Sequence, residues 1–181
     1  MKPTEMLTKE HGLIRQALDN MHLAVEKLET GEKPPRQFFD KAVEFSRAFS
    51  DKFHHFKEEY LMFARLAQKK KGALDAQIDA LRYQHERGRG IVNEIANSID
   101  AYAKGEDAKT LILMENLAAY VALLRHHIHR EDHIFYPMVD KELSKDDQKY
   151  LLDEFKKKES EDGGKAFANS QKLVQEMGSL L

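Results

Sequence analysis

Two segments of the chain repeat one short pattern, a histidine followed four residues later by a glutamate. The pattern occurs at His54 and Glu58 and again at His127 and Glu131. In a helix, residues four positions apart lie one above the other on the same face. Imidazole and carboxylate groups together suit ions such as iron, manganese and zinc. Each pair is therefore a candidate for half of a metal site.

Two single histidines extend this candidate site. His11 and His85 each interrupt a row of apolar residues spaced three or four apart, and His127 and Glu131 interrupt a similar row. Such rows are typical of helices that pack along a seam in a bundle. Because a buried polar side chain needs a partner, we expect these residues to face one another.

The elements that must position these residues are helices. Three short breaks that contain proline or glycine separate segments rich in Leu, Ala, Glu, Lys and Gln. The breaks are TGEKPP at 30–35, KKKG at 69–72 and KGED at 104–107, and the predicted helices span about 5–29, 36–69, 73–103 and 107–142. Short connections make successive helices antiparallel neighbours. The sequence therefore predicts an all-α, up-down-up-down four-helix bundle.

The last forty or so residues predict a C-terminal helical extension. Ser144, with an acid three residues later, is a helix N-cap signal, and DGG at 162–164 ends that helix before a final short one. We expect a bundle domain at 1–142 and an extension at 143–181 that packs on it. Aromatic residues of the second helix share a face, which we expect the extension or a partner subunit to cover.

The predicted bundle brings the polar seam residues to one level. Each histidine lies about 18 to 20 residues from the same end of the bundle, so their heights agree to within roughly one turn. Four imidazoles and two carboxylates are enough for two metal ions and leave positions open for another ligand, because six side chains cannot fill two octahedral shells. The predicted metal ligands are His11, His54, Glu58, His85, His127 and Glu131.

Composition removes several other classes of function. With 29 basic and 31 acidic residues, the chain has no electrostatic footprint for nucleic acid or for an anionic membrane. It has no cysteine, which excludes thiolate nucleophiles and cysteine-ligated zinc or iron–sulfur clusters. No stretch approaches the roughly 20 apolar residues that span a bilayer, and the first residues hold no apolar leader. We therefore expect a cytoplasmic protein without nucleic-acid or membrane partners.

The motifs resemble those of hemerythrin-like proteins, the family with a His-His-Glu cation-binding domain. The motifs are EHGLIRQAL around His11, HHFKEEYLMF at 54–63, YQHERGR around His85 and HIHREDHIFYP at 127–137. The family's second motif reads His-x-x-x-Glu-Glu-x-x-(Leu/Met)-Phe. By this resemblance His54 and Glu58 are ligands, whereas His55 and Glu59 are neighbours. The fourth motif has the same form and selects His127 and Glu131.

One departure separates the chain from the oxygen carriers of that family. The carriers place a second histidine four residues after the third-helix histidine, where this chain has Arg89. The carriers' His-x-x-x-x-Asp spacing leads from His127 to Asp132, so Asp132 stays an alternative to Glu131. Glu159 in the extension is a second alternative ligand. The looser ligand set resembles the branch implicated in iron sensing, nitric oxide or peroxide chemistry, and iron-centre repair.

The resemblance implies a non-haem di-iron centre that binds or reacts with O2, peroxide or NO at an open metal position. The implied cofactor is a pair of iron ions bridged by carboxylate and oxo groups, with zinc or manganese as substitutes. An iron- or oxygen-sensing or storage module without turnover is the alternative, and whether the protein is an enzyme stays open. A homodimer or a regulatory protein partner is compatible with either function.

Two smaller features carry open interpretations. Gly88 lies one turn from His85 and either leaves a pocket through which a small ligand reaches the metals or only permits close helix packing. The remaining histidines of the fourth motif are expected on the surface, because helical rotation carries them away from His127. They are His126, His129 and His133.

Overall fold

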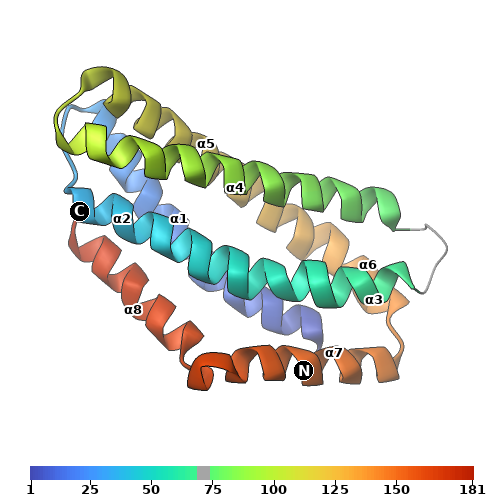
Figure 1. Ribbon diagram of the computed structural model, residues 1–181. Helices are drawn as coiled ribbons and strands as arrows, with labels where there is room; N and C mark the ends of the chain where they lie inside the picture. The colour runs from blue at the N-terminus through green and yellow to red at the C-terminus, as the bar shows by residue number, and fades with distance from the viewer. Residues whose placement is uncertain (69–73) are drawn as a thin grey trace.

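The computed structural model describes residues 1–68 and 74–181, and within them every regular element is a helix (Figure 1). The elements are α1 (Pro3–Glu29), α2 (Arg36–Phe45), η1 (Ser46–His55), η2 (Lys57–Met62), α3 (Phe63–Ala67), α4 (Asp75–Ala103), α5 (Asp107–Arg130), η3 (Glu131–Phe135), α6 (Tyr136–Glu142), α7 (Lys145–Ser160), η4 (Glu161–Gly164) and α8 (Ala166–Ser179). The predicted all-α class is confirmed. The predicted break at 69–72 lies outside the described residues.

Long helical rods lie beside one another among the described residues (Figure 1). The second rod runs continuously through α2, η1, η2 and α3, and the fourth through α5, η3 and α6. Helix α4 packs on α5 and α2, and α1 packs on α5. Helices α7 and α8 then run along the side formed by α1 and the second rod. None of the described helices is long and apolar enough to cross a membrane.

Two of the connections between helices contain a glycine with a positive φ angle. Gly31 (φ 85°) follows α1 and Gly105 (φ 82°) follows α4. After α1, the amide of Glu32 bonds to the carbonyl of Lys27 at 2.8 Å, which satisfies a carbonyl that the helix end would leave free. Ser144 caps α7 as the sequence predicts, because its hydroxyl accepts from the Asp147 amide at 3.2 Å.

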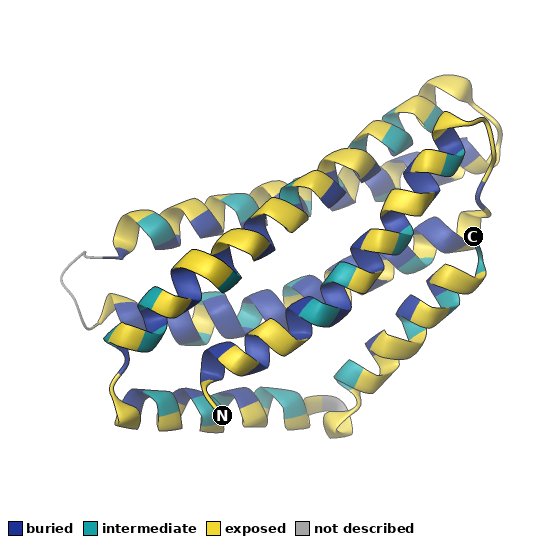
Figure 2. Cartoon of the chain, turned by 180° about the vertical axis from the view of Figure 1, so that it is seen from behind, coloured by how far each residue is buried: buried dark blue, intermediate teal, exposed yellow. Residues whose placement is uncertain are grey.

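The interior consists of two apolar clusters with a polar layer between them. The larger cluster runs from Leu13 in α1 to the aromatic residues of η1 and includes Met177 of α8. The smaller cluster gathers the start of α1 with α3, α6 and α7, and Phe155 of α7 belongs to it. Figure 2 shows the buried residues on the inward faces of the rods. The rods therefore bury the polar seam residues as well as the apolar ones.

The second and fourth rods depart from regular α-helix at the predicted ligands. Segments η1, η2 and η3 are π-helical. A π-helical turn bonds residues five apart, so successive side chains rotate less than in an α-helix, and such turns occur often at functional sites. The sequence reasoning assumed α-helical rotation throughout, which is wrong for these segments. In η1, the adjacent residues His54 and His55 are both buried.

The C-terminal helices contact the aromatic face of the second rod. Phe167 of α8 packs edge-on against Phe49, with ring centroids 5.7 Å apart. Phe45, Phe49 and Phe53 are buried, whereas Tyr60 is 64% exposed. The aromatic residues therefore do not form one covered face, because Tyr60 turns to the surface.

Substitutions at two glycines are expected to change stability in opposite directions. Gly31→Ala places a Cβ in the left-handed region and should lower the free energy of unfolding by about 1–2 kcal/mol. Gly90→Ala lies in the middle of α4 with no atom within 4 Å of the added Cβ, and should raise it by about 0.5–1 kcal/mol. Urea unfolding of both variants measures these two free-energy changes. Equal changes in the two variants would contradict the assigned backbone conformations.

Candidate metal centre

Six buried side chains from all four rods meet in the polar layer. Each is at most 2% exposed. They are His11 from α1, His54 from η1, Glu58 from η2, His85 from α4, His127 from α5 and Glu131 from η3. The structure thus brings together every residue of the predicted ligand set.

The first of two candidate ligand groups lies between α1 and the π-helical segments. It consists of His11, His54, Glu58 and Glu131, whose ligand atoms all lie within 4.8 Å of one another. The Nε2 atom of His11 is 3.3 Å from Oε2 of Glu131, and Nε2 of His54 is 3.8 Å from Oε2 of Glu58.

The second group lies beside the first and shares a glutamate with it. It consists of His55, Glu58, His85 and His127, also within 4.8 Å. The Nε2 atom of His85 is 3.4 Å from Oε2 of Glu58 and 3.0 Å from Nε2 of His127. Glu131 reaches toward this group too, with Oε2 at 3.2 Å from Nε2 of His127. Both glutamates therefore lie where two groups of ligands meet.

Each of the four predicted histidines is held through its outer nitrogen. The Nδ1 contacts are His11 to Asp132 at 2.9 Å, His54 to Glu10 at 2.9 Å, His85 to Glu59 at 2.6 Å and His127 to Gln84 at 2.8 Å. An ionised carboxylate and the amide oxygen of Gln84 only accept hydrogen bonds, so these Nδ1 atoms must donate. In the neutral imidazole that leaves a lone pair on Nε2, which points into the centre. This arrangement is the usual support of a metal-bound histidine.

Basic side chains in turn hold the supporting carboxylates. Arg15 donates to Asp132. The ammonium of Lys57 donates to Glu10. The guanidinium of Arg89 donates to Glu59 at 2.8 Å.

These contacts set the pKa of Asp132. Its half-burial favours the protonated form, but hydrogen bonds from His11 and Arg15 outweigh this and lower its pKa to about 2. Asp132 therefore stays ionised and keeps accepting from His11.

Several buried atoms in the centre have no hydrogen-bond partner among the described residues. They are Nε2 of His54, Oε2 of Glu58 and both carboxylate oxygens of Glu131. In addition, the Nε2 atoms of His85 and His127 lie 3.0 Å apart, so one of them must carry a proton unless a cation binds between them. A buried polar atom without a partner costs on the order of 1–3 kcal/mol, and more when it is charged. Bound cations would satisfy all of these atoms, so the donor set fits metal ions.

Without a metal, the carboxylates of the centre also favour positive charge on the histidines beside them. Burial disfavours the protonated form of His11, but the hydrogen bond to Asp132 and the nearby charge of Glu131 raise its pKa to about 9. Burial opposes protonation of His85 as well, and Glu58 and Glu59 raise its pKa to about 9. Without a metal, the carboxylates therefore hold protons on two of the histidines.

Two further residues of the centre are Tyr136, which the sequence did not point to, and His55, which was predicted as a neighbour of the ligands. The hydroxyl of Tyr136 donates to Oε1 of Glu58 at 2.6 Å, and its ring stacks on His11 with centroids 5.5 Å apart. Burial and the charge of Glu58 raise the pKa of Tyr136 well above its usual value. His55, predicted to be only a neighbour, stacks on His85 with centroids 3.8 Å apart. The signal for Tyr136 was its place five residues after Glu131, one π-helical hydrogen bond along the rod.

The two alternative ligands lie outside both candidate groups. Asp132 supports His11 through Nδ1 instead of facing the centre. The carboxylate of Glu159 is 3.2 Å from the ammonium of Lys57. The three remaining histidines of the fourth motif are exposed, as expected from the sequence: His126, His129 and His133.

A pocket of about 380 Å³ opens beside the second ligand group, between η1, α4 and α5. His55 and His85 line it together with Gly88, Tyr120 and Leu124. A Cβ at position 88 would lie 3.7 Å from Leu124 and 3.8 Å from Tyr120, which are ordinary contacts. Close helix packing therefore does not require glycine at this position, and of the two interpretations of Gly88 the pocket is the one that the geometry favours.

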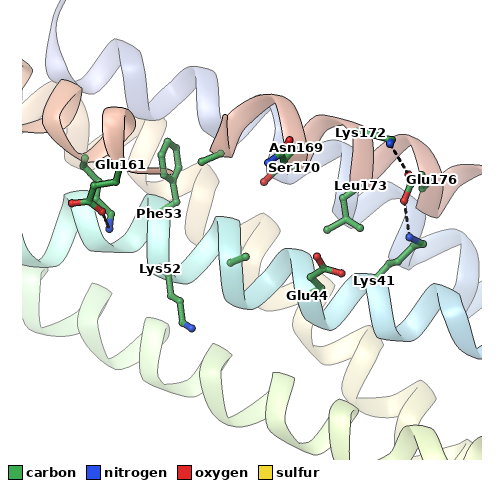
Figure 3. A pocket seen from close by; sticks show the side chains of 13 residues that line it. Lys41, Glu44, Lys52, Phe53, Glu161, Asn169, Ser170, Lys172, Leu173 and Glu176 are labelled. Atoms are coloured by element: carbon green, nitrogen blue, oxygen red, sulfur yellow. Dashed lines mark hydrogen bonds and ion pairs between the residues drawn. The ribbon is translucent and has the colours of Figure 1, made fainter. Parts of the chain in front are cut away.

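A second hollow lies away from the metal centre. This groove of about 640 Å³ runs between α8 and the second rod (Figure 3). Charged side chains dominate it, and Glu176 pairs with Lys41 at 2.6 Å and with Lys172 at 3.7 Å. None of the candidate metal ligands lines the groove.

Comparison with known proteins supports the cation-binding character of this centre. The family model described as hemerythrin HHE cation binding domain matches residues 2–139. Uncharacterised proteins of Mycobacterium tuberculosis and Mycobacterium bovis are 25% identical over 162 residues, which is 90% of this chain. The chain spans 63% of the length of these relatives. No solved structure matches the chain significantly.

The metal-free protein is expected to lose stability as the pH rises from 6.5 to 9. A histidine whose pKa is raised by folding contributes stability that is complete below its unfolded value and is lost through its folded value. For His11 and His85 this window runs from 6.5 to about 9. Urea unfolding of metal-free protein at several pH values measures it. Glu131→Gln should shrink the loss, because Glu131 charge raises both pKa values, and a flat profile in the wild type would contradict the assignment.

Proposed function

The chain belongs to the hemerythrin HHE cation-binding domain family, and we propose that it is a non-haem di-iron protein that binds or reacts with O2, peroxide or NO. The observation that carries the proposal is the set of inward Nε2 and carboxylate atoms that have no other partner among the described residues. Iron suits mixed imidazole and carboxylate ligands, and zinc or manganese could substitute. The proposed fold is an up-down-up-down bundle of residues 1–142 with a C-terminal extension at 143–181.

In this proposal the six predicted residues are the metal ligands. The four histidines would be terminal ligands, one set on each side of the glutamates. Glu58 and Glu131 would bridge, because each lies within 4 Å of histidines from both groups. His55 adds a further nitrogen to the second group. Bound iron would supply the electrons for chemistry at a small ligand.

In this proposal the protein orients the ligand side chains, keeps water from the centre and provides a route for the small ligand. The supporting contacts at Nδ1 fix the histidine rings, and Tyr136 holds one oxygen of Glu58. Buried apolar residues such as Phe63 and Leu124 keep water from the centre. The pocket beside Gly88 is the proposed route for the small ligand, since its lining includes His55 and His85.

The alternative function is an iron- or oxygen-sensing or storage module without turnover. One observation favours it. Glu159 of α7 contacts Lys57, Lys57 donates to Glu10, and Glu10 accepts from the Nδ1 atom of His54, so the extension is connected to a candidate ligand. Steady consumption of peroxide or NO by the iron-loaded protein would support an enzyme. Reversible binding without consumption would support the sensing or storage module. A regulatory partner or a homodimer and a cytoplasmic location stay predictions from the sequence.

Loss of either shared glutamate is expected to reduce iron binding. Glu58→Ala and Glu131→Ala each remove oxygen ligands from both groups, so the iron content should fall from about two to one or fewer ions per chain. The near-ultraviolet band of the aerobic iron protein should fall with it. Glu115→Ala, at an exposed position on α5, is the matched control. Wild-type iron content and spectrum in both site variants would overturn the proposal.

A large side chain at position 88 is expected to slow ligand access without removing the metal. Gly88→Leu would place its side chain in the pocket beside His85, and stopped-flow association of azide with the iron protein should slow roughly tenfold or more, about 1.4 kcal/mol in the barrier. Gly90→Leu is the control, because position 90 is exposed and open. An unchanged rate at equal iron content would exclude this route.

A further inference from the structure

Lys57 is an unusual residue for the interior of a protein. Its side chain is completely buried, and it immediately precedes the candidate ligand Glu58. Lysine is almost never fully buried unless its charge is paired, because removing an ammonium from water costs several kcal/mol. Here the ammonium donates to Oε1 of Glu10 and lies 3.2 Å from Oε1 of Glu159. Both partners come from other helices, Glu10 from α1 and Glu159 from α7.

Aromatic rings complete the surroundings of this ammonium. Its Nζ lies 3.8 Å from the centroid of the Phe53 ring and 5.8 Å from that of Phe155. A cation over the face of an aromatic ring is attracted by the ring electrons. Phe155 is fully buried and belongs, like Glu159, to α7. Helix α7 thus supplies one ring and one carboxylate to the site that shields Lys57.

The same ammonium reaches the metal centre through one residue. Glu10 is 2% exposed and uses its two oxygens differently. Oε1 accepts from Lys57, and Oε2 accepts from Nδ1 of His54 at 2.9 Å. Nε2 of His54 is one of the inward atoms without a partner in the described structure. A continuous line of contacts therefore runs from α7 through Lys57 and Glu10 to His54.

We propose that Lys57 couples the docking of helix α7 to metal binding at His54. This inference rests on the proposed function, because it needs a metal at His54. With α7 docked, Lys57 is shielded from water and fixes Glu10, which holds the His54 ring with Nε2 inward. With α7 undocked, water competes for Lys57 and the His54 ring loses its fixed support.

The coupling must act in both directions. If docking of α7 raises the affinity for metal, then metal raises the stability of docked α7 by the same factor. Residues that support a metal-bound histidine typically change metal affinity by about 10–100-fold. Helix α7 is therefore the element whose docking reports metal occupancy.

Amide hydrogen exchange with and without ferrous iron, under anaerobic conditions, tests the coupling in the full chain. In the wild type, iron should slow exchange over Lys145–Ser160 by about tenfold or more, because the coupling is reciprocal and the expected change in iron affinity is about 10–100-fold. Lys57→Met keeps the length of the side chain and removes its charge. This variant should bind iron about 10–100-fold more weakly by chelator competition and should lose the iron-dependent slowing in α7.

The controls separate charge coupling from a structural role. Lys157→Met removes a lysine from α7 itself at a side chain that is 73% exposed, and it should behave as the wild type does. If Lys57→Met fails to fold because Glu10 loses its cation, the double variant Glu10→Gln/Lys57→Met replaces the buried ion pair by neutral groups of similar size. The double variant should fold and bind iron while its α7 exchange no longer responds to iron.

Three outcomes would overturn the coupling. Wild-type iron affinity together with wild-type protection of α7 in Lys57→Met would do so, and so would iron-dependent protection of α7 in the double variant. Iron binding to the wild type without any change in α7 exchange would overturn the coupling alone and leave the proposed function standing. A wild type that binds no iron would overturn the proposed function and the coupling with it.

Discussion

The structure depends on the burial of two glutamates among histidines in the middle of a helical protein. Glu58 and Glu131 are completely buried, and three of their four oxygens have no hydrogen-bond partner among the described residues. Uncompensated negative charge in a low-dielectric interior is among the largest single costs that a fold can carry. The apolar clusters on both sides prevent water from reducing this cost. Positive charge inside the layer, as protons or as metal ions, is therefore a condition for the fold.

The surroundings of the layer follow from this constraint. Each histidine must turn Nε2 inward, so each needs an acceptor at Nδ1. Three of those acceptors are carboxylates, and each carboxylate has its own cation farther out: Arg15 for Asp132, Lys57 for Glu10 and Arg89 for Glu59. Charge thus alternates from the centre outward. This alternation draws in residues from α1, η2 and α4, and through Glu159 also from α7.

Much of this could be predicted from the sequence, for reasons that are specific to helices. The three-and-four spacing of apolar residues predicted helices whose bounds differ from the structure by about two residues. Six of the residues that meet in the layer were also predicted, but His55 and Tyr136 were not among them. The supports were not predicted. Glu10 contacts His54, 44 positions later in the chain, and Lys57, 47 positions later. Such contacts join different helices, and the periodicity within one helix does not encode them.

The two rods that contribute a His-Glu pair are also the two that depart from regular α-helix. Both His-x-x-x-Glu pairs lie in or next to π-helical turns, whereas His11 and His85 lie in regular α-helix. In a π-helical turn, residues four and five positions apart are both close to one full turn, so more of the local side chains point to the same side. In η1, both His54 and His55 belong to the candidate ligand groups, and Tyr136 of the fourth rod donates to Glu58. The repeated His-x-x-x-Glu pattern is thus only part of each half-site, and the wider helical turn supplies the rest.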